Sequence, residues 1–282
     1  MLRKWFVTVV VFCLAALVCA PVVLVLFGSL KSGNELADSL RPVLSGAEGS
    51  GGIRFSLLPC YPTISHFSKL LFRMPEFFTV FWNSVKIVSL VIAGQLIVAV
   101  PAAWAFAVYR FKGRGILFTL YVMLMLLPFQ VTMLPSYLVM NDMHLMDTQA
   151  SVILPAVFST FPVFLIYRGF TSVPKEMLEA ARVDGAGEFR IFWKVGIPLG
   201  SPGILSAIIL GFLDAWNMIE QPLAFLKDKT LWPLSLYLPE IGPEQAGTAL
   251  AASVVTLVPA VFVFAAGQDY LEKGIVAAGV KG

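Results

Sequence analysis

The sequence predicts an all-α membrane protein with six transmembrane helices and with both termini in the cytoplasm. Its 282 residues are 58% hydrophobic and only 13% charged, about half the charged fraction of a soluble domain. Six apolar runs each exceed or approach the roughly 20 residues that a spanning helix needs. Basic side chains gather in alternate loops between these runs, as the positive-inside rule describes.

The first run, residues 5–27, lies behind Arg3 and Lys4. It is longer than the apolar core of a cleavable signal peptide, about 7–15 residues, so residues 1–27 are expected to form an uncleaved first transmembrane helix. Residues 28–76 are the longest polar stretch and are predicted as an extracytoplasmic loop with a flexible glycine- and serine-rich tether at 45–52.

Five further runs follow at roughly 77–109, 116–140, 150–169, 201–226 and 248–268. The run 77–109 exceeds one span, so its outer end is expected to be an interfacial segment. Residues 77–268 are predicted to form a core of five spans that includes the polar segment 171–199. Residues 269–282 are then a cytoplasmic tail.

The loops set the orientation. The loop 110–115 contains three lysines or arginines and no acid, and the segment 170–200 contains four, whereas the loop 141–149 contains none. The two segments with lysine and arginine are therefore placed in the cytoplasm. The basic residues that carry this prediction are Arg110, Lys112, Arg114, Lys175, Arg182, Arg190 and Lys194.

Several functional classes are disfavoured. The net charge of +3 is too small for a nucleic-acid footprint. Two histidines and three cysteines offer no metal or disulfide framework, and Cys13, Cys19 and Cys60 are interpreted as unpaired thiols. His144 with Asp142 and Asp147 is interpreted as a polar loop rather than a metal site.

The segment 171–199 is the most informative. Thr171 and Ser172 are predicted as helix N-caps and Pro174 as a first-turn residue. Gly185 is predicted to end the helix, and a second short helix is expected at about 188–195. From spacing alone, an ordinary amphipathic interfacial helix remains an alternative.

This segment resembles the EAA loop of ABC-importer permeases, E-A-A-x3-G-x9-I-x-L-P. The matching residues are Glu179, Ala180, Ala181 and Gly185, followed by Val195, Gly196, Ile197 and Pro198. Val195 and Ile197 replace the family's Ile and Leu. The stretches 106–114 and 128–135, Asp147-Thr148 with 153–155, Trp216-Asn217, and the ending 274–282 resemble the six-span subunit of maltose-type sugar permeases.

The resemblance implies a permease subunit that forms half of a sugar translocation pore in a bacterial or archaeal cell membrane. It implies a sister permease subunit, two copies of a cytoplasmic ATPase and an extracytoplasmic solute-binding protein as partners, with lipid around the spans. ATP and Mg would bind to the ATPase, so that this chain needs no cofactor. The residues implied in ATPase coupling are Glu179, Ala180, Ala181, Gly185, Gly279, Val280, Lys281 and Gly282.

A candidate substrate path lies in the fifth run. Asp214, Asn217 and Gln221 are spaced i, i+3 and i+7, with Trp216 beside them. On one helix this spacing makes a polar stripe, which could contact a sugar or pack against a sister subunit.

Three alternatives remain open at this point. One is an ABC importer for a non-sugar solute. A self-contained secondary carrier is less consistent with the sequence because no internal repeat is found. A membrane enzyme with a catalytic Asp214 has no second motif. The sequence contains no GxxxxGK[ST] phosphate loop, so any ATP hydrolysis requires another chain.

Overall fold

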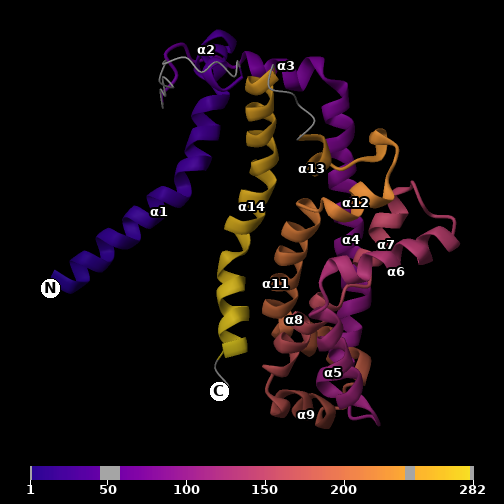
Figure 1. Ribbon diagram of the computed structural model, residues 1–282. Helices are drawn as coiled ribbons and strands as arrows, with labels where there is room; N and C mark the ends of the chain where they lie inside the picture. The colour runs from indigo at the N-terminus through magenta and orange to yellow at the C-terminus, as the bar shows by residue number, and fades with distance from the viewer. Residues whose placement is uncertain (1, 45–57, 239–244, 280–282) are drawn as a thin grey trace. The chain divides into compact units, whose positions relative to one another are not determined.

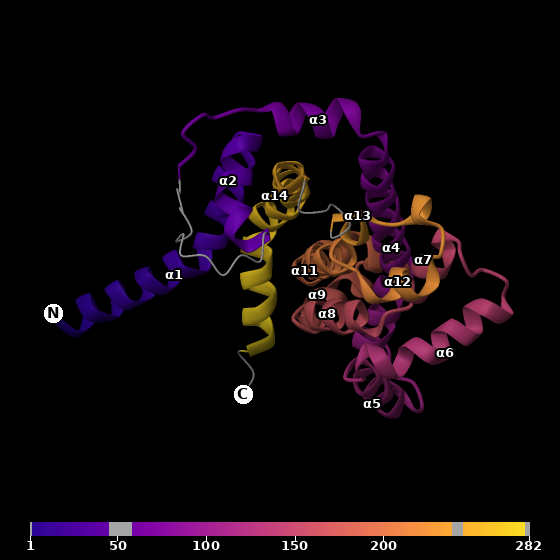
Figure 2. The ribbon, with the colours of Figure 1, turned by 45° about the horizontal axis from the view of Figure 1, so that its top comes forward.

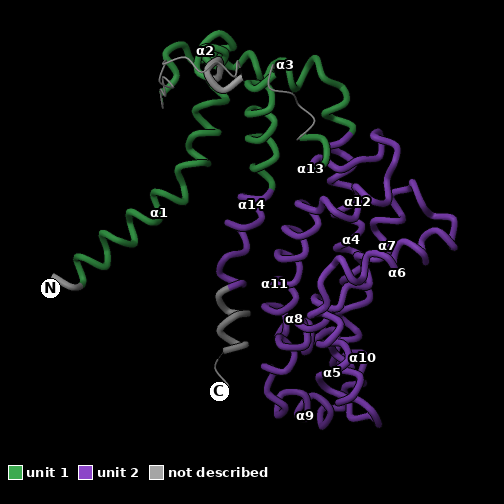
Figure 3. The backbone as a smooth tube through the Cα atoms, viewed as in Figure 1, with its two compact units in different colours: residues 1–79, 236–259 green, residues 80–235, 260–282 purple. Residues whose placement is uncertain are grey.

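The computed structural model describes residues 2–44, 58–238 and 245–279, and its regular elements over these ranges are all helices (Figure 1). The predicted all-α class is confirmed. The chain divides into two compact units, residues 1–79 with 236–259 and residues 80–235 with 260–282 (Figure 3). The predicted tether at 45–52 lies outside the described residues.

The first unit contains α1 (Leu2–Ser29), α2 (Gly33–Leu44), α3 (Ser65–Arg73) and the first part of α14 (Ala246–Gly279). The backbone N–H of Thr63 donates to the carbonyl of Leu30 (2.8 Å), and Nε2 of His66 lies 3.1 Å from the carbonyl oxygen of Lys31. The polar stretch 28–76 therefore includes two helices that its composition did not predict.

Within the described residues, five helices or helix runs are long and apolar enough to cross a membrane. The predicted number of six is reached if one bent pair is counted as a span. One of the five is α4 (Pro75–Val108), which covers the long second run as a single helix with no break at its outer end.

The bent pair corrects the third predicted run. Residues 116–140 are not one straight helix: α5 (Arg114–Met125) and α6 (Phe129–Asp142) meet at 103°, and α6 leaves α5 at a sharp angle in Figure 2. Pro128 stands at the break with an extended backbone, φ −63° and ψ 145°. Proline cannot continue the hydrogen-bond ladder and disfavours a helical residue before it, which explains the break.

The fourth run is interrupted but still counts as one span, residues 149–171. It comprises α7 (Gln149–Val157) and α8 (Thr160–Thr171). Near the interruption, the side-chain amide of Gln95 on α4 donates to the carbonyl of Ala156 (2.9 Å). The same carbonyl also accepts the backbone N–H of Ser159 (3.2 Å), so the Gln95 bond adds a second donor where the helix is interrupted.

The fifth run begins earlier and ends earlier than predicted. The short helix α10 (Glu188–Ile191) continues through a π-helical turn, η1 (Phe192–Gly196), directly into α11 (Ile197–Trp216). The remainder of the predicted run is a separate helix, α12 (Glu220–Phe225), followed by a 3₁₀ turn, η2 (Lys229–Leu231), and by α13 (Leu234–Tyr237). The sixth run is covered by α14, which continues past residue 268 without a break.

Within the second unit, α8 and α11 approach so closely that their backbones touch. A Cβ atom added to Gly203 would lie 2.7 Å from the Cα of Gly169, and one added to Gly169 would lie 2.8 Å from the Cα of Gly203. Small residues at such contacts allow close backbone approach, which is a main source of helix association in lipid.

We therefore expect Gly203→Ala to destabilise the second unit by about 1–3 kcal/mol, because one added methyl group must separate two backbones. The matched control is Gly115→Ala in α5, where an added Cβ meets nothing within 4 Å. Thermal unfolding followed by size-exclusion chromatography in mild detergent measures the difference. Equal stability of the two variants would contradict this close packing.

Candidate functional site

The predicted EAA segment folds as a short exposed helix, α9 (Lys175–Val183). It begins one residue after Pro174, which has an extended backbone. The prediction that Thr171 and Ser172 are its N-caps is wrong. Their hydroxyl groups donate to the carbonyls of Arg168 (2.9 Å) and Gly169 (2.7 Å), so both residues belong to the end of α8. Serine and threonine hydroxyls readily make such local bonds to the preceding turn.

Gly185 ends α9 as the sequence predicted. The N–H of Gly185 donates to the carbonyl of Arg182 (3.0 Å), and the N–H of Ala186 donates to the carbonyl of Ala181 (3.0 Å). This pair of bonds is a Schellman motif. Gly185 has φ +78°, a backbone conformation that a side chain disfavours, and an added Cβ would meet nothing within 4 Å. Glycine is required here by the backbone conformation and not by crowding.

The two faces of α9 differ. Leu178 is buried and Ala181 packs against the hydrophobic cluster of the second unit, whereas Glu179 and Ala180 are exposed. Val183 is 87% exposed at the end of the helix. The structure thus brings the four EAA residues together on one short helix and its cap, with a carboxylate and a small side chain on the outer face.

An ion pair joins the end of α9 to the start of α10. Nε of Arg182 lies 2.7 Å from Oε1 of Glu188, and a second guanidinium nitrogen donates to Oε2 at 3.2 Å. The Tyr109 hydroxyl, just beyond α4, donates to the same carboxylate at 3.3 Å. The hydrogen bond from Arg182 to Glu188 raises the pKa of the Arg182 guanidinium above its usual value. The sequence identified Arg182 only as one of the basic residues that set the membrane orientation. It did not predict the ion pair with Glu188.

The predicted C-terminal coupling residues are only partly described. Gly279 is the last residue of α14, and Val280, Lys281 and Gly282 lie outside the described residues.

The predicted polar stripe is corrected. Asp214 and Asn217 lie at the end of α11, but the helix ends at Trp216, and Gln221 belongs to α12. Asn217 is the C-cap, and its side-chain amide donates back to the carbonyl of Leu213 (2.8 Å). The i, i+7 spacing therefore does not place Gln221 on the same helix face as Asp214.

The four residues of the predicted path also differ in exposure. Asp214 and Asn217 are exposed. Trp216 is 4% exposed and stacks on Phe212, with ring centroids 5.5 Å apart. Gln221 is buried, and its amide donates to the carbonyls of Ser151 and Val152, both at 3.2 Å.

Asp147 has a structural role that its loop composition did not reveal. Its Oδ1 accepts hydrogen bonds from the backbone N–H groups of Lys227 (2.7 Å) and Asp228 (2.9 Å), and its own N–H donates to the carbonyl of Phe225 (3.0 Å). These N–H bonds, that of Asp228 first, lower the pKa of the carboxyl group. Asp147 thus fastens the loop before α7 to the segment after α12. Among the described residues, no cluster of three or more His, Cys, Asp or Glu side chains could hold a metal ion.

Residues 95–277 match the family model described as the binding-protein-dependent transport system inner membrane component. The chain belongs to this family, and it is a multi-pass membrane component of a transport system.

Relatives extend the similarity over almost the whole chain. The arabinooligosaccharides transport system permease protein AraQ of Halalkalibacterium halodurans is 30% identical over 282 residues, which are 99% of this chain and 97% of the relative. AraQ of Bacillus subtilis is also 30% identical and covers 95% and 92% of the two chains. The sn-glycerol-3-phosphate transport system permease protein UgpE of Yersinia pestis is 29% identical over 69% of this chain and 71% of its own.

A solved structure shares the fold. A chain from the crystal structure of a bacterial ABC transporter involved in the import of the acidic polysaccharide alginate superposes with a TM-score of 0.81 over 95% of this chain and 96% of its own, at 23% sequence identity.

We expect Asp147→Ala to accelerate amide hydrogen exchange of residues 226–231, because the Lys227 and Asp228 N–H groups lose their acceptor. Acidification is expected to weaken the same hydrogen bonds. The pKa is lowered in the folded state, so the contribution of the carboxylate is present above the ordinary aspartate range and is lost as the pH falls through the lowered value. Exchange mass spectrometry at neutral pH measures the effect. The control is Asp142→Ala at a nearby exposed acid, and equal exchange in the two variants would contradict the role of Asp147.

Proposed function

We propose that this chain is the permease subunit of an ATP-driven carbohydrate importer, and that α9 couples closure of a separate ATPase to alternating access of the spans. The observation that carries the proposal is the geometry of α9: it exposes Glu179 and Ala180, is capped by Gly185, and is tied to α4 and α10 through Glu188. A short helix held at both ends can transmit an external push to the spans without adding chemistry.

The proposed partners are a sister permease subunit, two copies of a cytoplasmic ATPase and an extracytoplasmic binding protein. Each permease subunit supplies half of the path. ATP and Mg bind to the ATPase, since this sequence has no phosphate loop. The lysines and arginines of the segments 110–115 and 170–200 support a cytoplasmic position for α9 and for the C-terminal end of α14. Residues 279–282 are proposed to take part in coupling to the ATPase.

A carbohydrate cargo is supported by the two AraQ relatives, whose names specify arabino-oligosaccharides and which align over nearly their whole length. A second candidate is a phosphorylated polyol, which the alignment with UgpE favours. Within the path we assign Asp214 and Asn217 to the lining, because both side chains are exposed at the end of α11. Trp216 and Gln221 are assigned to supporting that helix end, because both are buried against neighbouring helices.

The proposal predicts that Gly185→Val impairs transport more than folding. Valine disfavours the positive φ at this position and would reorient the helix end, at a strain of about 1–2 kcal/mol. The test solute is the one that copurifies with the native binding protein. Its uptake is compared with the amount of folded chain in the membrane. Gly185→Asn should retain more uptake, because asparagine tolerates this conformation.

The matched control is Gly187→Val, two residues away. Gly187 has φ −68°, and an added Cβ meets nothing within 4 Å. A proportional loss of folded protein and uptake in Gly185→Val would contradict a role of the cap in coupling.

The proposal also predicts that Glu179→Arg releases the ATPase. The charge reversal lies on the exposed face of α9, so the chain should remain folded and keep its sister subunit. Mild-detergent purification from the native cell followed by mass spectrometry measures the partners. Asp142→Arg, an equal charge reversal at an exposed acid at the end of α6, should retain them. An ATPase recovered equally with both variants would contradict docking on α9.

A further inference from the structure

The π-helical turn η1 lies directly against a buried tryptophan. A Cβ atom added to Gly196, the last residue of η1, would overlap the six-membered ring of Trp104 on α4, at its Cζ3, Cη2 and Cε3 atoms. Trp104 is 4% exposed. The contact leaves no space for any side chain at residue 196, so the shape of the turn and the position of the indole depend on each other.

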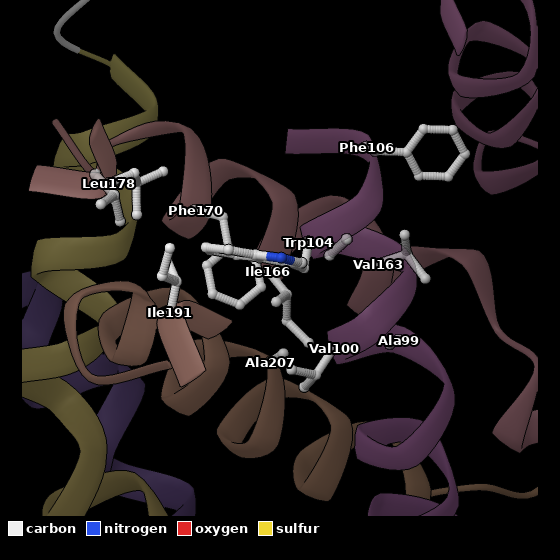
Figure 4. Close-up of a cluster of buried hydrophobic side chains, with 12 residues drawn as sticks. Ala99, Val100, Trp104, Phe106, Val163, Ile166, Phe170, Leu178, Ile191 and Ala207 are labelled. Carbon is white, nitrogen blue, oxygen red and sulfur yellow. The ribbon is translucent and has the colours of Figure 1, made fainter. Parts of the chain in front are cut away.

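The same indole also contacts the end of α8, the helix that leads into α9. Its ring meets that of Phe170, at the end of α8, edge-on, with centroids 5.1 Å apart and an interplanar angle of 79°. Figure 4 shows the two side chains pointing toward one another within the cluster. Phe170 in turn fills the space over Gly200, where an added Cβ would overlap its ring. The chain enters α9 from α8 and returns through α10 to η1, so segments on both sides of α9 contact Trp104.

Helix α9 joins this cluster through its own buried face. Leu178 of α9 and Ile191 of α10 are buried among the same set of hydrophobic side chains as Trp104 and Phe170, and Phe192 of η1 packs on the indole with centroids 5.5 Å apart. The Trp104 indole thus joins α4, on which it lies, to α8 and η1, within the cluster that contains the buried face of α9.

The indole is present for its shape and not for its polar group. The Trp104 Nε1 atom is buried and has no hydrogen-bond acceptor among the described atoms. A buried N–H without a partner is unfavourable. A tryptophan at this place is therefore explained by the volume and flatness of its ring, which fill the space that Gly196 leaves.

We propose that Trp104 is a positioning residue for coupling: by packing under Gly196 it fixes the π-helical register of η1, and so sets the rotation of α9 and α10 relative to α11. A π turn contains one residue more than an α-helical path, and π turns are frequent at functional sites. Relaxation of η1 to an α-helix would rotate α10 by about 100° about the α11 axis, since each helical residue turns by that angle. This inference rests on the proposed coupling role of α9.

The test uses the complex purified from the native cell with its sister permease, ATPase and binding protein, reconstituted in lipid vesicles. The variants are Gly196→Ala, which forces a methyl group into the indole, Trp104→Phe, which empties the overlapped space without removing a hydrogen bond, and the double variant. The readout is the stimulation of ATP hydrolysis by the binding protein, measured on assembled complexes. Gly187→Ala is the control, because its Cβ enters open space.

We expect each single variant to reduce the stimulation by roughly two- to thirtyfold, the range typical of coupling mutations, while the double variant recovers part of the loss. Amide exchange of residues 192–196 should change in the same order. Full stimulation in folded Gly196→Ala complexes, or a double variant no better than either single one, would overturn the inference. If Gly196→Ala does not assemble, Trp104→Phe alone decides: full stimulation would overturn the inference.

Failure of the proposed function would look different. In that case the wild-type complex itself would show no stimulation by a binding protein, or no ATPase would purify with it. Loss confined to the Trp104 and Gly196 variants, with Gly187→Ala like the wild type, is the pattern that supports the inference.

Discussion

Close backbone contact between α8 and α11 is the constraint on which the rest of the second unit depends. Gly169 faces Gly203, Phe170 fills the space over Gly200, and Trp104 fills the space over Gly196. Gly196, Gly200 and Gly203 lie about one helical turn apart along the continuous helix formed by η1 and α11. Each of the three glycines therefore contacts a different residue of the neighbouring helices. In a bilayer the hydrophobic effect does not draw helices together, and close packing has to supply the attraction. The position of α9 follows, because the chain reaches it from α8 and returns through α10 and η1 to α11.

The polar bonds of the second unit are placed where helices are interrupted. Gln95 pairs a carbonyl at the end of α7, Gln221 pairs two carbonyls near its start, and Asp147 accepts two N–H groups after α12. Asn83 similarly donates to the carbonyls of Thr230 and Trp232. Breaks in membrane helices expose backbone groups that lipid cannot satisfy, so they persist where protein groups pair them. These irregular segments are therefore stabilised, as the helices are, by hydrogen bonds within the protein.

The sequence predicted what depends on local composition and spacing. Apolar runs give the class and the number of spans, and Gly185 gives the end of α9, because only a residue that tolerates positive φ completes that cap. Three features were not predicted in this way. The break at Pro128 falls inside an unbroken apolar run. Trp216 ends α11 before Gln221, although hydropathy continues beyond it. Trp104 and Gly196 are 92 positions apart in the printed sequence (196 − 104), and nothing local pairs them.

The exposed and buried faces of α9 make different contacts. Leu178 and Ala181 tie it to the cluster beneath, whereas Glu179 and Ala180 remain available to a partner. A helix of this length is not stable alone in water, so its form depends on the cap at Gly185, the bonds of Arg182 and Tyr109 to Glu188, and the packing on Ile191. Different residues of one short helix therefore supply its attachment and its exposed face. In the proposed coupling role, a push on the outer face is transmitted to α4, α8 and α11 through the side chains that hold the helix in place.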